Sequence, residues 1–243
     1  MWLLVRGKAL NTSLILSLGR EGIAKLSFTS RLIETHTDEN GDIRHEIDIA
    51  GATAIATSVL NPGIQKRGQR EVDRVLGKDI LPTFDDRKNL PYVDAICKEC
   101  LRWEAITPLG ATHNVDVDDY YNGYLIPAGT AIVPNQWAML RDPKEYSIPE
   151  KFMPDRWRSD LEDGYVQENY WQKTLSLLIT VASLLATFDF QKATDINGTP
   201  ITPSGEYDDS LIRGPKPFRC MISPRSNAMS IVVRDAADAD VIA

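Results

Sequence analysis

Cysteine is scarce in this sequence, with three residues among 243. Cys97, Cys100 and Cys220 are too few and too unevenly placed for a disulfide framework, which favours a reducing compartment. Histidine is equally scarce, and the three histidines show no spacing typical of metal ligands. We expect surface or loop positions for all of them (His36, His45 and His113).

The sequence also lacks a long apolar run and a basic run. The longest uncharged stretch, Thr174 to Phe188, is shorter than the ~20 residues of a membrane-spanning helix, so we expect a buried core helix there. The first residues show no signal-peptide pattern. The net charge of -7 comes from scattered acidic residues, and no run of lysine and arginine could follow a phosphate backbone. We therefore expect no nucleic-acid partner, and the cellular location is left open.

Apolar and charged residues are present in ordinary proportions, at 43% and 25% of the chain. This composition and length indicate a globular chain with a core rather than a disordered tail. No internal repeat is visible and no linker divides the sequence. We expect one interdependent unit over residues 1–243.

The spacing of apolar residues predicts several helices. Two helices with a break are expected between Thr12 and His36, and others over about 45–60 and from Pro62 to a stop at Gly77. A helix with one buried stripe is expected over about 90–101, and a helix that is apolar nearly all round over about 172–186. The intervening KDILPTFDDRKNLP is expected to be a polar loop.

Short β-rich runs separate these helices. Asn122-Gly123 and Pro127-Ala128-Gly129 are turn signals that predict a hairpin within residues 111–135. PKPFRCMISPR (215–225) is the clearest strand-like run near the end. Three prolines within residues 142–157 exclude regular structure, so we expect a meandering coil there. The predicted fold class is mainly α with small β-sheets.

KECLRW, at residues 98–103, places Glu99 and Arg102 three positions apart on an expected helix. Residues at this spacing are neighbours, so the two side chains can pair at the edge of the apolar stripe. One interpretation is a surface ion pair, which contributes ~0–1 kcal/mol. However, PDRW (154–157) ends the proline-rich coil with Arg156, and a coil without backbone ladders needs side-chain anchors to stay ordered.

These motifs resemble those of one family. KECLRW resembles the Glu-x-x-Arg signature of cytochromes P450, and PDRW resembles their Pro-Glu-Arg-Phe/Trp motif, with Asp155 in place of the usual glutamate. LPYVDAICKECLRWEAITPLG, YNGYLIPAGTAIVPNQWAMLRDP and FMPDRW follow in the order and spacing of fungal P450s, and the similarity covers residues 27–157 and 171–226. The resemblance implies that Glu99, Arg102 and Arg156 interlock as structural residues that hold the coil on the helix.

The resemblance also implies a reaction. In the family, a cysteine thiolate binds a haem iron, and electrons from NADPH-cytochrome P450 reductase and O2 are used to oxygenate an apolar small molecule. The family's cysteine lies in a glycine-rich loop between the arginine motif and the long apolar helix. Here that interval, residues 158–173, reads RSDLEDGYVQENYWQK and contains no cysteine. We therefore expect no axial ligand, no metal site and no haem bound as a thiolate complex, since Cys97, Cys100 and Cys220 lie in helix or strand positions.

Two further differences separate this chain from the family. The family's Ala-Gly-x-Asp/Glu-Thr pattern, whose acid and hydroxyl deliver protons to bound oxygen, corresponds to AGATA at residues 50–54. Thr53 occupies the position of the acid and Ala54 that of the threonine, so no catalytic residue is retained there. The chain resembles a truncated P450 fold, the C-terminal half, without the membrane anchor that places the family at the endoplasmic reticulum.

Other interpretations stay open. Cys97-Lys98-Glu99-Cys100 is formally a C-x-x-C motif, although a redox site would need the helix to begin at the first cysteine and a zinc site would need a second pair. A non-catalytic fragment that binds a partner or an apolar ligand through uncovered apolar surface is the alternative to an enzyme. Misjudged introns or a decaying gene would explain the internal gaps.

Overall fold

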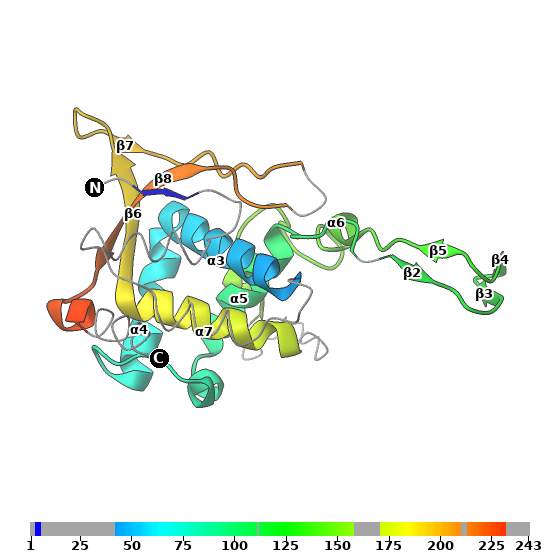
Figure 1. Cartoon of the computed structure of the whole chain (residues 1–243), viewed down its shortest axis with the longest axis horizontal. Helices are drawn as coiled ribbons and strands as arrows, with labels where there is room; N and C mark the ends of the chain where they lie inside the picture. The colour runs from blue at the N-terminus through cyan, green and yellow to red at the C-terminus, as the bar shows by residue number, and fades with distance from the viewer. Residues whose placement is uncertain (1–2, 6–41, 111, 158–170, 210–212, 232–243) are drawn as a thin grey trace.

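The computed structural model describes residues 3–5, 42–110, 112–157, 171–209 and 213–231. The helices expected between Thr12 and His36, and residues 158–170 of the interval without a cysteine, lie outside the described residues. The described residues form a body of helices against an antiparallel sheet, from which a narrow arm extends (Figure 1). The predicted class, mainly α with small β-sheets, is confirmed.

Four helices make up most of the body: α3 (Asp42–Leu60), α4 (Pro62–Leu76), α5 (Pro91–Trp103) and α7 (Trp171–Thr187). Pro62 separates the first two, because proline disfavours helix at the residue before it and its missing N–H costs nothing in a first turn. Gly77 ends α4 with a φ of 89°, a conformation that favours glycine. The helices predicted over 45–60, 62–76, 90–101 and 172–186 are therefore all present, with shifts of a few residues at their ends.

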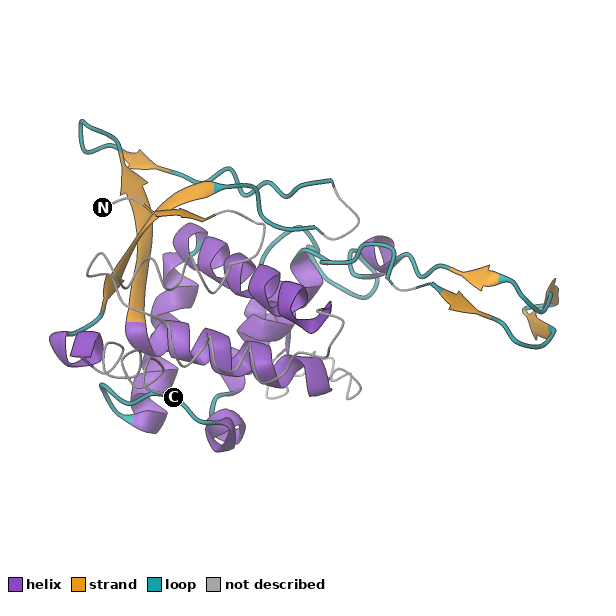
Figure 2. Ribbon diagram, viewed as in Figure 1, coloured by secondary structure: helices purple, strands orange, loops and turns teal. Residues whose placement is uncertain are grey.

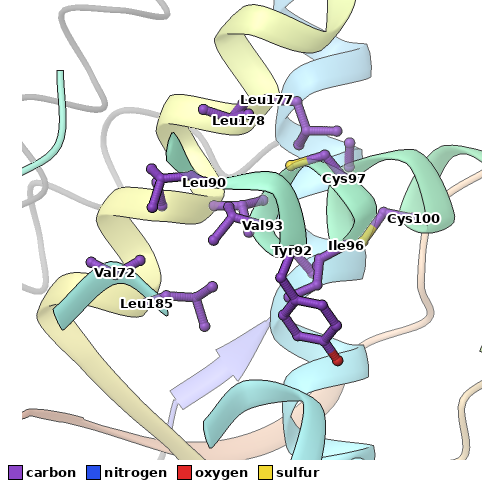
Figure 3. Close-up of a cluster of buried hydrophobic side chains, with 14 of the residues drawn as sticks. Val72, Leu90, Tyr92, Val93, Ile96, Cys97, Cys100, Leu177, Leu178 and Leu185 are labelled. Carbon is purple, nitrogen blue, oxygen red and sulfur yellow. The ribbon is translucent and has the colours of Figure 1, made fainter. Parts of the chain in front are cut away.

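The helices bury their apolar stripes against one another. Figure 3 shows side chains from α4, α5 and α7 that meet at the centre of the body. We call this cluster the helical core; it includes Val72, Leu90, Tyr92, Val93, Ile96, Leu177, Leu178 and Leu185. Gly68 allows α4 to approach, since a Cβ there would lie 2.8 Å from Leu185 Cδ1 and 3.2 Å from Ile96 Cδ1.

The sheet of the body has the strand order β1-β8-β6-β7, with every neighbouring pair antiparallel. Its strands are β1 (Leu3–Val5), β6 (Phe188–Thr194), β7 (Pro200–Ile201) and β8 (Phe218–Pro224). One face packs on α3 through a second cluster, the sheet core, which includes Ala52, Ile55, Val59, Phe188, Phe190 and Phe218. The strand predicted within residues 215–225 is confirmed.

Two glutamine side chains of α4 connect that helix to β6. The Gln65 amide donates to the Phe190 carbonyl at 2.9 Å and accepts from the Phe190 N–H at 2.7 Å, as a neighbouring strand would. Gln69 donates to the Phe188 carbonyl at 3.0 Å. Since all these groups are buried, the contacts satisfy backbone atoms that would otherwise be costly to bury.

The arm is a long hairpin that leaves the body after α5 (Figure 2). Its strands are β2 (His113–Asn114), β3 (Asp119–Tyr121), β4 (Tyr124–Ile126) and β5 (Ala131–Ile132), paired as β2 with β5 and β3 with β4. Asn122 and Gly123 form the turn with positive φ values of 50° and 83°, as a two-residue hairpin turn requires. The predicted hairpin is confirmed.

Parts of the prediction were wrong in detail. The expected polar loop contains a 3-10 helix, η1 (Phe84–Asn89), because Thr83 and Asp86 form a capping box that nucleates it. PDRW at the end of the expected coil is also a 3-10 turn, η2 (Pro154–Trp157). A short helix that was not predicted, α6 (Gln136–Met139), follows the arm, where the Asn135 side chain accepts the Ala138 N–H. No helix among the described residues is both long and apolar enough to cross a membrane.

Candidate functional site

The structure brings Glu99, Arg102 and Arg156 together where α5 meets the proline-rich coil. Arg102 donates to both carboxylate oxygens of Glu99 at 2.9 Å, and Arg156 Nε donates to Oε1 at 3.1 Å. The Met153 N–H donates to Oε1 and the Trp157 indole N–H to Oε2, each at 2.8 Å. We call these five residues the Glu99 cluster.

Both arginines use their remaining N–H groups on backbone carbonyls. Arg102 Nη1 donates to the Leu140 carbonyl at 2.9 Å. Arg156 donates from Nη1 to the Ser147 carbonyl at 2.9 Å and from Nη2 to the Lys151 carbonyl at 3.2 Å. The coil has no strand ladder, so these guanidinium groups supply hydrogen bonds that its carbonyls would otherwise lack.

Burial decides what the Glu99 cluster can do. The side chains of Glu99, Arg102 and Arg156 are 0%, 1% and 7% exposed. Charges buried this deeply must be paired, and here two guanidinium groups surround one carboxylate. That carboxylate already accepts five hydrogen bonds, against about four lone-pair sites. It has no free position for a substrate proton, so the geometry suits anchoring rather than acid-base chemistry.

A second, partly buried ion cluster lies beside the first, and the sequence did not predict it. Glu104 accepts from Arg141 at 2.8 Å and from Arg213 at 3.0 Å. The same two guanidinium groups lie against the Trp137 ring, with their Cζ atoms 3.3 and 4.5 Å from its centroid. Burial raises the pKa of Glu104, while the two arginines act in the opposite direction. No local spacing predicts this contact, because Arg213 is 109 residues from Glu104.

None of the three cysteines fits a thiolate ligand. Cys97 and Cys100 lie within α5 in the helical core, and Cys220 lies on β8 in the sheet core. Burial raises the pKa of all three thiols, that of Cys220 to about 12. Ligating and reactive cysteines instead have a lowered pKa and partial exposure. The position of Cys97 and Cys100 also argues against a C-x-x-C redox site. Such a site has its first cysteine at the start of a helix, whereas α5 begins at Pro91.

Thr53 and Ala54 are buried in the middle of α3. Thr53 Oγ1 accepts a hydrogen bond from the Tyr207 hydroxyl at 3.1 Å, and Thr57 Oγ1 donates to the Thr53 carbonyl at 2.8 Å. The hydroxyls of this stretch are thus used within the protein. A proton relay toward bound oxygen would need a titratable group there, and Thr53 and Ala54 are not titratable at neutral pH.

The histidines are dispersed. His113 is exposed on β2, as expected for a surface residue, while His45 belongs to α3 and His36 lies outside the described residues. Within the part of the chain that the structure describes, no three or more His, Cys, Asp or Glu side chains are grouped so as to hold a metal ion.

Comparison with known proteins gives consistent matches. The family model described as "Cytochrome P450" matches residues 53–172. The chain is 37% identical over 246 residues to the cytochrome P450 monooxygenase claR of Ampulloclitocybe clavipes, covering 89% of this chain and 45% of the relative. It is 35% identical over 248 residues to the cytochrome P450 monooxygenase eriA of Hericium erinaceus, covering 88% and 47%. The chain thus spans about half the length of these curated relatives.

Solved structures agree with the sequence matches. A zebrafish cytochrome P450 with abiraterone superposes with a TM-score of 0.64 at 26% identity, over 75% of this chain and 44% of the other. The same kind of protein with progesterone gives 0.64 at 25% identity. The motifs around Glu99, the fold that places them together and these relatives lead to one conclusion: the chain belongs to the cytochrome P450 family, of the fungal type.

Proposed function

We propose that this chain forms part of the helical body of a P450 monooxygenase but does not itself perform the family's reaction. That reaction inserts one oxygen atom of O2 into an apolar small molecule, with electrons from an NADPH-dependent reductase. The observation that carries the proposal is that the three cysteines are buried. Each is fully buried within a helix or strand, and burial raises the pKa of each thiol.

The chemistry of the family depends on a thiolate. Haem, when bound, supplies the iron that activates O2, and the cysteine thiolate favours O–O cleavage by donating electron density. A cysteine ligand must also reach the iron, whereas these three side chains are packed among the apolar residues of the helical core and the sheet core. Exposing Cys97 or Cys100 would require α5 to leave the helical core, which would also displace Glu99. The cysteines present therefore do not fit the axial position.

For the Glu99 cluster we propose a structural role that does not depend on haem. One buried carboxylate binds α5 to a coil that ends at Arg156 and Trp157. Fork-shaped guanidinium groups fix geometry as well as charge, which suits a contact that must hold a coil in one conformation.

The test is a spectrum of the purified chain. The chain is incubated with hemin, reduced with dithionite and exposed to carbon monoxide, beside a functional P450 monooxygenase as positive control. We expect the control to give the absorption band of a thiolate-bound carbon monoxide complex and this chain to give none. A thiolate band from this chain would overturn the proposal, and Cys97→Ala, Cys100→Ala and Cys220→Ala would then identify the ligand.

Sequencing of the transcript across the codons for Trp157 to Trp171 provides an independent check. If the transcript matches this sequence, the proposal applies to the protein in the cell. If it contains a glycine-rich segment with a cysteine, the encoded protein has the missing ligand. In that case the family's haem, reductase and apolar substrate are the expected partners.

The exposed arm is the observation in favour of a second candidate function, that of a non-catalytic interaction protein. Tyr120, Tyr121 and Tyr124 are 68–77% exposed at its tip, and aromatic side chains are frequent in protein interfaces. Light scattering during size-exclusion chromatography separates the candidates. An interaction protein should elute as one defined species, whereas an incomplete enzyme should aggregate through the same side chains.

A further inference from the structure

Helix α3 is covered by protein on every side along residues 50–59. All ten residues are buried or nearly so. A helix that is apolar almost all round and buried in this way normally lies in a packed core. In the P450 family, by contrast, the Ala-Gly stretch of this helix, which corresponds to residues 50–54, must face bound oxygen.

Two clusters of apolar side chains account for much of this burial. Ala50 and Ala54 pack into the helical core, whereas Ala52, Ile55 and Val59 pack into the sheet core on the other side. The two clusters together cover both faces of α3.

The glycine of the stretch faces α7. A Cβ placed on Gly51 would lie 3.7 Å from Thr180 Cγ2, which is ordinary van der Waals contact. Between Gly51 and Thr180, the two helices are therefore separated by about the room that one methyl group would fill. A planar cofactor would need several ångströms between them.

Tyr207 covers α3 at Thr53. It comes from the loop between β7 and β8, is 6% exposed, and donates a hydrogen bond to Thr53 Oγ1 at 3.1 Å. Its ring packs edge-on against Trp103, with centroids 6.1 Å apart. The loop also meets the end of α3, where a Cβ on Gly205 would lie 3.5 Å from Leu60 Cδ1. Thr53, which stands where the family has an acid, thus has a protein partner.

We infer that the stretch of α3 that faces oxygen in the family is a closed core element in this chain, sealed by the Tyr207–Thr53 contact, so that the described body folds without haem. This inference goes beyond the proposed function, which concerns only a thiolate complex. It states that hemin is excluded whatever its iron ligand.

Hemin is the probe for the first test. The purified chain is titrated with hemin while the Soret band and the thermal unfolding midpoint are followed, and refolding from urea is compared with and without hemin. We expect no saturable Soret shift, the same Tm within about 1 °C at excess hemin, and equal refolding yields. Saturable one-to-one binding with a raised Tm, or a refolding yield that depends on hemin, would overturn the inference. Hemin bound through a non-thiolate ligand would do so while leaving the proposed function intact.

Conservative variants test the contact itself. Tyr207→Phe keeps the ring and removes one hydroxyl, and Thr53→Val keeps the shape and removes the partner. We expect each to lower Tm by about 2–8 °C, and the double variant to lose clearly less than the sum of the two. The matched control is Tyr124→Phe, the same change at a side chain that is 77% exposed, which should leave Tm unchanged. If Tyr207→Phe melts like Tyr124→Phe, the contact does not seal the core and the inference fails.

Discussion

At position 99, one buried carboxylate pairs with two buried guanidinium groups. Glu99→Ala would remove the charge while leaving Arg102 and Arg156 inside the protein. Breaking a buried pair from one side costs more than the pair contributes, because the remaining charge stays desolvated. We expect the free energy of unfolding, measured by urea denaturation, to fall by about 3–5 kcal/mol.

The control for this variant is Glu206→Ala. Glu206 also pairs with a basic residue, Lys216 at 3.0 Å, but both side chains are largely exposed. Solvent screens such a pair, so its removal should not move the urea midpoint. Coincident unfolding curves for Glu99→Ala and Glu206→Ala would show that the buried cluster contributes no more than a surface pair.

The buried thiols should make the folded protein less stable at alkaline pH. Burial raises the pKa of Cys220 to about 12, whereas a cysteine in the unfolded chain has a pKa of about 8.5. Above that lower value the unfolded chain binds fewer protons than the native chain, so stability is lost as pH rises toward 12. Cys220 alone should account for about 2 kcal/mol of loss between pH 7.5 and pH 10.

Urea unfolding of the wild type and Cys220→Ala at both pH values isolates this contribution. The variant should lose about 2 kcal/mol less than the wild type over the same interval. An equal loss in both proteins would mean that the Cys220 thiol ionises at the same pH in the folded and unfolded chain.

Local spacing explains which contacts of the candidate site could be predicted. Glu99 and Arg102 are three residues apart on one helix, so their pairing follows from helix geometry. Arg156 was inferred from the family motif, whereas the Met153 N–H and the Tyr207–Thr53 contact have no local signal. Tyr207 and Thr53 are 154 residues apart, and only the packing of the whole body brings them together.

Helix α4 contains two glycines in different surroundings, which gives a matched comparison at the scale of one element. A Cβ on Gly63 would meet nothing within 4 Å, whereas a Cβ on Gly68 would lie 2.8 Å from Leu185 Cδ1. Alanine stabilises a helix by about 0.5–1 kcal/mol over glycine where there is room, and overpacking costs about 1–3 kcal/mol.

We therefore expect opposite outcomes for the two substitutions. Gly63→Ala should raise the free energy of unfolding, and Gly68→Ala should lower it, by a difference of about 1–3 kcal/mol between the variants. Thermal unfolding by circular dichroism is sufficient to measure this. Equal stability of the two variants would mean that α4 does not pack closely on α7.

Elements with a strong local signal were the predictable ones. Pro62 and Gly77 delimit α4, and Asn122-Gly123 identifies the hairpin turn. The end of α7 was predicted at about residue 186, but strand β6 was not predicted, because Phe188 follows Thr187 directly with no turn residue between them. Its strand conformation depends on long-range pairing with β8, from Phe188 opposite Pro224 to Lys192 opposite Cys220.

On the scale of the whole molecule, the body has a buried apolar core, whereas the strands of the arm are largely exposed. A two-stranded hairpin alone is marginally stable, and this one has exposed tyrosines at its tip. The hairpin was predictable, but its position away from the body was not, because a turn signal says nothing about what a hairpin packs against.

Limited proteolysis with chymotrypsin should reveal this difference. Among the described residues, we expect the first cuts after Tyr120, Tyr121 or Tyr124, whereas Tyr92, in the helical core, should resist. The two pieces should still elute together from a native sizing column, because α5 on one side of the cut packs against α7 on the other. Separation of the pieces, or earlier cutting at Tyr92, would contradict this picture.

The Glu99 cluster also has a consequence for folding kinetics. Arg102 is three residues from Glu99, but Met153, Arg156 and Trp157 are 54, 57 and 58 residues away. Closing a loop of that length costs about 3–4 kcal/mol of chain entropy plus a constant. Nearly all of this entropy is lost when the first of the three contacts forms. The other two then form at little further cost. The coil should therefore dock in one cooperative step, and in native-state hydrogen exchange the Met153 amide and the Trp157 indole N–H should open together.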